Sequence, residues 1–166
     1  NSERSFAEQD AGIWVVRAFV DEFDLPTDEY YLTNVTRFDG TFSNSVAERE
    51  VLTASLIVSA DDNRKDEVTL FLWEYGKYRV QNLSTTTWED YSIVVMDCNG
   101  KKYHTSGTMY TDRIYIDDPQ LVLNILKMGG TVRFSVSEKD NPLNKYVITI
   151  PIATGFDAAY LQYWNK

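Results

Sequence analysis

The chain has 166 residues, the length of a single domain, and a core of this size needs no disulfide or metal to be stable. Its 25 acidic and 16 basic side chains give a net charge of −9, which opposes the phosphate backbone and argues against a nucleic-acid partner. One cysteine and one histidine exclude an intramolecular disulfide and a structural zinc site, and no apolar run approaches the roughly 20 residues of a membrane-spanning helix.

The N-terminal residues differ from the rest of the chain. Residues 1–11 are polar and lack periodicity, which predicts a flexible segment. Residues 12–166 contain no repeat and no low-complexity stretch, which predicts one domain. The first run of this domain, from Ile13 to Val20, is rich in β-branched residues and favours a strand, with a short helix as the alternative.

Irregular structure is predicted after this run. Residues 21–34 contain Pro26 and several acids, which predicts an irregular connection. Asp39-Gly40 then predicts a turn between two short extended pieces. Asn34-Val35-Thr36 also has the N-glycosylation pattern, which is used only in a eukaryotic secretory setting.

Two strands are predicted in the middle of the chain. In residues 52–59 apolar side chains alternate with polar ones, which predicts a half-buried strand. In residues 68–75 both faces are apolar, which predicts a central strand or a core face backed by an exposed aromatic face. The side chains predicted to share the core faces are Leu52, Ala54, Leu56, Val58, Val68, Leu70 and Leu72.

The only cysteine and the only histidine flank a predicted hairpin turn. Asn99-Gly100 is a strong hairpin signal, because both residues tolerate the positive φ of a type I′ turn. A two-residue loop would place Val95 opposite His104. In that register Cys98 and His104 point to opposite faces, whereas Asp97 shares the face of His104. Cysteine and histidine are therefore predicted not to form a reactive pair.

The last third predicts a helix, a strand pair and a second helix. Asp118-Pro119 and Gly129 are consistent helix start and stop signals. Residues 131–137 and 145–152 predict two strands, and residues 154–164 predict a short helix. The side chains predicted to face the core are Leu121, Ile125, Met128, Val132, Phe134, Val136, Tyr146, Ile148, Ile150, Ile152, Phe156, Ala159, Tyr160 and Tyr163.

The segment "LVLNILKMGGTVRFSVSEKDNPLNKYVITIPIATGFDAAY" carries a resemblance to known families. Its order of short helix, glycine, strand, polar hairpin, strand, Gly-Phe and Ala-Tyr resembles the closing module of small uncharacterised bacterial envelope lipoproteins. It is also similar, more distantly, to the end of a small family associated with type VI secretion. The resemblance covers about residues 88–163. It implies a β-sandwich-like fold and an exported location, and it brings no catalytic residues.

Three groups of residues are candidates for a catalytic or metal site. His104 beside Asp97 has the arrangement of a general base, but no nucleophile accompanies it. The acidic loop 61–67 offers oxygen ligands for Ca²⁺, yet it lacks the spacing and the glycine of an EF-hand. Glu74, Glu89 and Asp90 are candidate carboxylates for glycoside hydrolysis, but the sequence does not place a pair of them across a cleft. We therefore assign no catalytic residue, no metal site and no cofactor.

Aromatic residues gather around one predicted strand and the loop after it. Phe71, Trp73 and Tyr75 would follow one another on one face about every 6.6 Å, which favours a ladder for a sugar or a peptide. Packing in the core is the alternative. The predicted ligand-binding residues are Phe71, Trp73, Tyr75, Tyr78 and Trp88.

Together these patterns predict a mainly β protein, an antiparallel β-sandwich with one or two short helices. The predicted function is that of a non-catalytic binding or structural accessory module of the bacterial cell envelope, with a glycan or another envelope protein as partner. We expect the chain to be exported to the periplasm or the cell surface, with a lipid anchor upstream of Asn1. The alternative is a hydrolase that uses surface carboxylates or His104.

Overall fold

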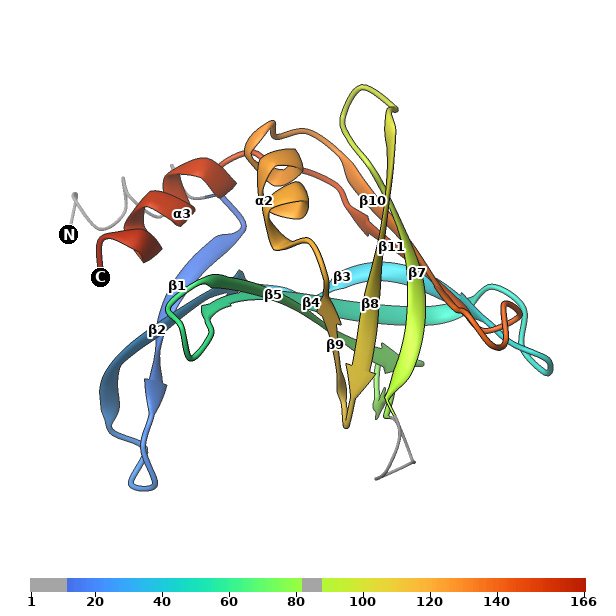
Figure 1. Ribbon diagram of the computed structural model, residues 1–166, viewed down its shortest axis with the longest axis horizontal. Coiled ribbons are helices and arrows are strands. Elements are labelled where there is room, and N and C mark those ends of the chain that lie inside the picture. Colours follow the sequence, from blue (N-terminus) through green and yellow to red (C-terminus); the bar gives the residue numbers. More distant parts are fainter. Residues whose placement is uncertain (1–11, 82–87) are drawn as a thin grey trace.

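The computed structural model describes residues 12–81 and 88–166, and just over half of them lie in antiparallel strands (Figure 1). The predicted flexible segment 1–11 lies outside the described residues. The elements are β1 (Trp14–Val20), β2 (Pro26–Asn34), β3 (Phe38–Ser43), β4 (Glu50–Ala60), β5 (Asp66–Glu74), β6 (Tyr78–Arg79), β7 (Glu89–Met96), β8 (Lys102–Tyr110), β9 (Arg113–Ile116), α2 (Pro119–Lys127), β10 (Val132–Glu138), β11 (Lys145–Ile150) and α3 (Phe156–Trp164). The predicted mainly β class is confirmed, and the described residues contain two helices where one or two short helices were predicted.

Eight of the strands close into one antiparallel barrel. Their order is β4-β3-β11-β10-β7-β8-β9-β5, and the pairing of β5 with β4 closes the ring. The predicted sandwich is therefore wrong, because what would be its two layers are parts of one closed sheet. Apolar and polar residues alternate in the same way in a sandwich and in a barrel, so this pattern does not distinguish the two folds.

The interior of the barrel is filled by the side chains that alternation predicted. The seven predicted core residues of β4 and β5 are at most 1% exposed: Leu52, Ala54, Leu56, Val58, Val68, Leu70 and Leu72. Those of β10 and β11 are buried as well: Val132, Phe134, Val136, Tyr146, Ile148 and Ile150. Ile152, which was predicted to continue this face, lies beyond β11 and is 59% exposed.

The two helices begin and end close to the predicted signals. The Asp118 side chain accepts a hydrogen bond from the backbone N–H of Leu121 at 3.2 Å, and Gly129 has a φ of +78° just beyond α2. The predicted apolar stripe of α2 is correct at Ile125 but wrong at Met128, which is 48% exposed. In α3 the predicted contacts are confirmed, since Phe156, Ala159 and Tyr163 are buried and Tyr160 packs against them.

β3 passes through the position where the sequence predicted a turn. Asp39 and Gly40 pair with Thr53 and Leu52 of β4, so the predicted turn is wrong. A Cβ atom on Gly40 would lie 2.1 Å from the carbonyl oxygen of Val147 in β11. Gly40 is therefore required because two neighbouring strands approach closely, as happens where barrel strands bend.

β1 and β2 form a hairpin that extends the sheet beyond β4, visible in blue in Figure 1. The predicted irregular connection is wrong from Pro26 onwards, since β2 begins there. A proline is tolerated as the first residue of a strand, and the acids that follow it are at the exposed end of the hairpin. β2 pairs with β4 only through Leu32 with Val58 and Thr33 with Ile57.

Trp14 anchors this hairpin to the barrel. Its indole Nε1 donates a hydrogen bond to the carbonyl oxygen of Ala153 at 3.2 Å. Its ring packs edge to face against Phe38 at 5.7 Å and against Phe156 at 4.9 Å. Because α3 also contacts both β1 and β2, the hairpin is held in a defined place beside the outer face of the barrel.

Candidate functional site

The structure does not bring Cys98 and His104 together. His104 is exposed and pairs with Val94, one residue from the predicted partner Val95, so the predicted register is wrong. Cys98 is exposed too, and its Cβ would lie 2.6 Å from a Cβ placed on Gly130, next to β10. β7 lies between β10 and β8, which carries His104, and no hydrogen bond joins the two side chains in residues 12–81 and 88–166.

Asp97 explains the shifted register. Its Oδ1 accepts hydrogen bonds from the backbone N–H groups of Asn99 at 2.9 Å and Lys101 at 3.0 Å, and the loop has three residues with Gly100 at a φ of +81°. Burial raises the pKa of Asp97, but these two bonds and one from the Tyr103 hydroxyl outweigh it and leave the pKa lowered. Asp97 therefore shapes the loop, and the predicted pair with His104 is wrong because the two side chains lie on opposite faces.

The acidic loop between β4 and β5 is organised by the same geometry. Asp61 Oδ1 accepts hydrogen bonds from the backbone N–H groups of Asn63 at 2.8 Å and Lys65 at 2.9 Å. Asp66 accepts a hydrogen bond from the hydroxyl of Tyr160 in α3. The part of the chain that the structure describes contains no group of three or more side chains placed to hold a metal ion.

Two of the acids considered for hydrolysis have perturbed pKa values. Burial and the negative charge of Glu138 raise the pKa of Glu89, and a hydrogen bond from the Tyr91 hydroxyl at 3.4 Å opposes this rise. Burial alone raises the pKa of Glu74. A raised pKa is what a general acid needs, but structural carboxylates beside buried groups share this property.

The five aromatic residues predicted to bind a ligand do not form one surface. Phe71 and Trp73 share the outer face of β5, with ring centroids 6.4 Å apart. Tyr75 has a φ of +53° after the strand and turns its ring towards Phe42 at 5.1 Å, so the predicted ladder ends at Trp73. The other two are exposed elsewhere: Tyr78 lies on β6, and Trp88 stacks on Tyr110 at 4.6 Å.

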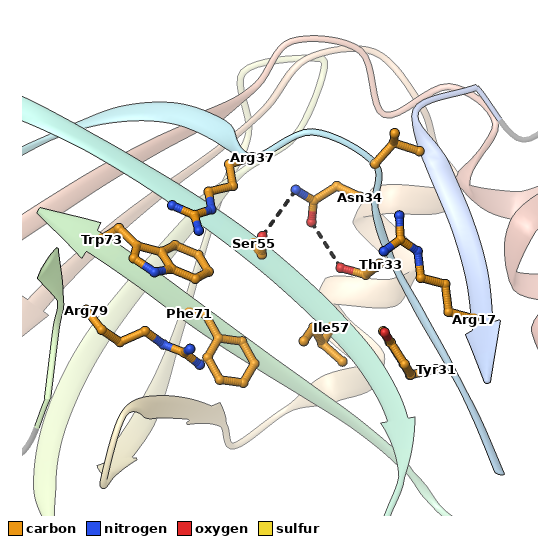
Figure 2. A pocket seen from close by; sticks show the side chains of 11 residues that line it. Arg17, Tyr31, Thr33, Asn34, Arg37, Ser55, Ile57, Phe71, Trp73 and Arg79 are labelled. Carbon is orange, nitrogen blue, oxygen red and sulfur yellow. Dashed lines mark hydrogen bonds between the residues drawn. The ribbon is translucent and has the colours of Figure 1, made fainter. Parts of the chain in front are cut away.

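Phe71 and Trp73 form the floor of an open groove of about 310 Å³ on the outside of the barrel (Figure 2). The groove lies between the β1–β2 hairpin and the outer faces of β4 and β5. Its remaining lining residues were not predicted from the sequence: Arg17, Tyr31, Thr33, Asn34, Val35, Arg37, Ser55, Ile57 and Arg79.

Arginine side chains cover the aromatic floor of the groove. The Arg37 guanidinium lies 3.7 Å from the ring centroid of Trp73, and that of Arg79 lies 4.1 Å from the centroid of Phe71. Arg113 approaches Phe71 as well, at 5.0 Å. At these distances the positive guanidinium is attracted to the negative faces of the rings. The aromatic side chains therefore hold arginines in place and present little free ring surface to a ligand.

Arg79 is the most enclosed of these cations. Burial lowers the pKa of its guanidinium, and the Asp112 carboxylate, 3.4 Å from Arg79 Nη2, opposes this effect. The Nε of Arg79 is buried and has no hydrogen-bond partner in the described ranges. The position of Arg79 beside Trp73 follows from the strand register, because the two residues pair across the β5–β6 hairpin.

Asn34 fixes the wall of the groove where β2 leaves β4. Its Oδ1 accepts a hydrogen bond from the backbone N–H of Leu56 at 3.0 Å, and its Nδ2 donates to the carbonyl oxygen of Thr36 at 2.7 Å. The Thr33 hydroxyl donates to the carbonyl oxygen of Leu56 at 3.0 Å. Asn34 and Thr33 therefore supply the hydrogen-bond partners that a paired strand would otherwise give the backbone N–H and C=O of Leu56. Asn34 is only 5% exposed, so it is not accessible as a glycosylation site in the folded chain.

No family model, curated protein or solved structure matches the chain. In residues 12–81 and 88–166 no helix is long and apolar enough to cross a membrane. The function is therefore inferred from the groove and its residues.

Proposed function

We propose that this chain is a non-catalytic binding module of the bacterial cell envelope that holds its ligand, a glycan or another envelope protein, in the outer groove. The observation that carries this proposal is the groove itself, an open cavity of about 310 Å³ with Trp73 and Phe71 on its floor and arginines around them. This volume lies at the lower end of the range of ligand sites. The β1–β2 hairpin that forms one wall is anchored by Trp14, so the groove is preformed.

A glycan array followed by a fluorescence titration tests the proposal. Trp73 lies in the groove, whereas Trp88 stacks on Tyr110 outside it, so the two tryptophans provide a matched pair. A ligand in the groove should change the emission of the wild type and of Trp88→Phe, but hardly that of Trp73→Phe. Calorimetry should show binding weakened by about tenfold or more in Trp73→Ala, because the support of Arg37 is lost. Equal affinity of Trp73→Ala and wild type would contradict the proposal.

Export and a lipid anchor upstream of Asn1 are part of the same proposal. They rest on the resemblance of residues 88–163 to envelope lipoproteins. A protein partner in the envelope would have a second surface available, since β1 lies at an edge of the sheet and can accept an added strand. Fractionation of a bacterium that makes the full protein should place it in the periplasm or with a membrane. Recovery only in the cytoplasm would rule out this location.

A hydrolase that uses surface carboxylates or His104 is the second candidate; Glu89 and Glu74, whose pKa values burial raises, are the carboxylates to test, and both lie outside the lining of the groove. Glycans that bind in the array should then be cleaved, and Glu89→Gln should abolish the cleavage while it leaves the fold intact. Intact glycan after prolonged incubation with the wild type would remove this candidate.

A further inference from the structure

The groove collects positive charge on a chain that is acidic overall. The net charge is −9, yet Arg17, Arg37 and Arg79 line the groove and no aspartate or glutamate does. Arg79 is paired with Asp112, which lies outside the lining. The ion pairs in the described part of the chain join Asp112 to Arg79 and Arg113, and neither Arg17 nor Arg37 takes part in one. The groove is therefore a local site of positive charge.

The hydrogen-bonding groups that remain available in the groove are mainly donors. The Arg17 side chain makes no hydrogen bond within the described ranges, and the Arg37 side chain uses only Nη1, which donates to the carbonyl oxygen of Gly76 at 3.2 Å. Among the neutral polar side chains, Asn34 and Thr33 are bonded to the backbone of Leu56 and Ser55 accepts a hydrogen bond from Asn34, whereas the Tyr31 hydroxyl has no hydrogen bond within the described ranges. A ligand that fits this surface has to supply acceptor oxygens, and a guanidinium pairs best with a carboxylate or a similar planar anion.

The shape of the groove favours a compact ligand over an extended peptide. β2, β4 and β5 all pair with neighbours at the groove, so their faces and not a free strand edge line it. A peptide that adds a strand needs such an edge. An open groove of about 310 Å³ suits a short saccharide, and the guanidinium groups over Phe71 and Trp73 leave little ring surface for a neutral sugar to stack on.

We infer that the groove binds a carboxylate-bearing saccharide, whose uronate groups pair with the guanidinium groups of Arg37, on the Trp73 side of the groove, and of Arg17, on the β1 side. This inference rests on the proposed binding function and narrows its ligand to one class. Trp73 acts indirectly, because it positions the Arg37 guanidinium that contacts the sugar acid.

Calorimetric titration with trigalacturonate, and with its methyl ester as the neutral match, tests the inference. The wild type should bind the acid and bind the ester at least about tenfold more weakly, since the ester cannot accept charge-assisted hydrogen bonds. Arg37→Gln and Arg17→Gln should each weaken binding of the acid by about tenfold or more. Arg37→Lys should bind with intermediate affinity, because it keeps the charge without the paired donors. Arg133→Gln is the control, since Arg133 lies on β10 and bonds to Thr149.

Each other outcome has a definite meaning once denaturant unfolding has shown that the variants are folded. Equal binding of acid and ester, or unchanged binding by Arg37→Gln and Arg17→Gln, overturns the inference that the ligand is a saccharide acid. The proposed binding function would stand. Displacement of trigalacturonate by an equal concentration of inorganic sulfate, or tighter binding of an acidic peptide, also overturns it. Absence of binding by trigalacturonate and by every glycan and envelope protein tried contradicts both the inference and the proposed function.

Discussion

Replacing Asn34 with alanine should destabilise the fold more than its small size suggests. β2 and β3 both pair with the same edge of β4, and the gap between them is bridged by the Asn34 side chain. Loss of the side chain leaves the buried N–H of Leu56 without a partner, which costs about 1–3 kcal/mol. The bond to the carbonyl oxygen of Thr36 contributes about 0.5–1.5 kcal/mol more, because that residue is exposed and water can replace the amide.

The expected loss in the free energy of unfolding is therefore about 1.5–4.5 kcal/mol, measured by urea denaturation. Asn44→Ala provides the control. Asn44 Oδ1 accepts hydrogen bonds from the backbone N–H groups of Val46 and Ala47, both at 2.9 Å, but in a surface loop where water can take its place. A loss below about 1 kcal/mol for Asn34→Ala, or a loss equal to that of Asn44→Ala, would refute the argument that Leu56 is left unsatisfied.

Three further substitutions test other features. Gly40→Ala should lower the free energy of unfolding by about 1–3 kcal/mol or more in urea denaturation, because the new Cβ would meet the Val147 carbonyl oxygen; an unchanged midpoint would contradict this contact. Glu89→Gln should raise the melting temperature at neutral pH. Because the pKa of Glu89 is raised above the ordinary 4.5, its contribution to stability is present below pH 4.5 and is lost as the pH rises through the pKa of the folded protein. The rise in melting temperature of Glu89→Gln over the wild type should therefore vanish below pH 4.5. A larger rise below pH 4.5 than at neutral pH would show that the shift has the opposite sign. His104→Ala should leave stability within about 0.5 kcal/mol of the wild type and ligand binding unchanged, since His104 is exposed; a large loss of either would assign it a role.

Local periodicity predicted which side chains are buried but not how the sheet closes. The buried faces of β4 and β5, and the caps of α2, follow from residue spacing and from Asp118 and Gly129, which act within a few residues of each other. Closure depends on pairs between distant residues, such as Thr69 with Tyr115 and Ile148 with Gly40. No local pattern encodes these pairs, so a sandwich and a barrel were equally compatible with the sequence.

The predicted hairpin register was wrong because residues 97–101 carry two turn signals and only the Asn-Gly signal was used. Asn99-Gly100 is typical of a two-residue loop, but Asp97 accepts two backbone N–H groups and stabilises a loop of three residues. The sequence contains the relevant pattern twice, as DDNRK in residues 61–65 and DCNGK in residues 97–101. In both loops the backbone N–H of the aspartate donates to the carbonyl oxygen of the lysine, at 2.8 and 2.9 Å. This repeated pattern of aspartate, asparagine and lysine was the sequence signal that could have predicted the three-residue loop.

The candidate site could be predicted only in part, for a similar reason. Phe71 and Trp73 were recognised because they are neighbours on one strand, whereas the arginines that line the groove with them come from β1, the connection before β3, and β6. These arginines come together where the β1–β2 hairpin joins β4. The sequence analysis predicted an irregular connection at the residues that form β2. The exception is Arg79, whose pairing with Trp73 follows from the short β5–β6 turn.

The charge distribution limits how an anionic ligand can reach the groove. A net charge of −9 repels an anion that approaches the protein, whereas the guanidinium groups attract it only close to the groove; salt screens both effects beyond about 8 Å at physiological ionic strength. Selectivity then comes from the few paired contacts inside the groove and not from steering by the whole protein. Added salt weakens both the repulsion and the attraction, so the affinity for a uronate should fall less with salt than three arginines alone would predict. Such a site favours ligands that present their carboxylate in the right place over anions in general.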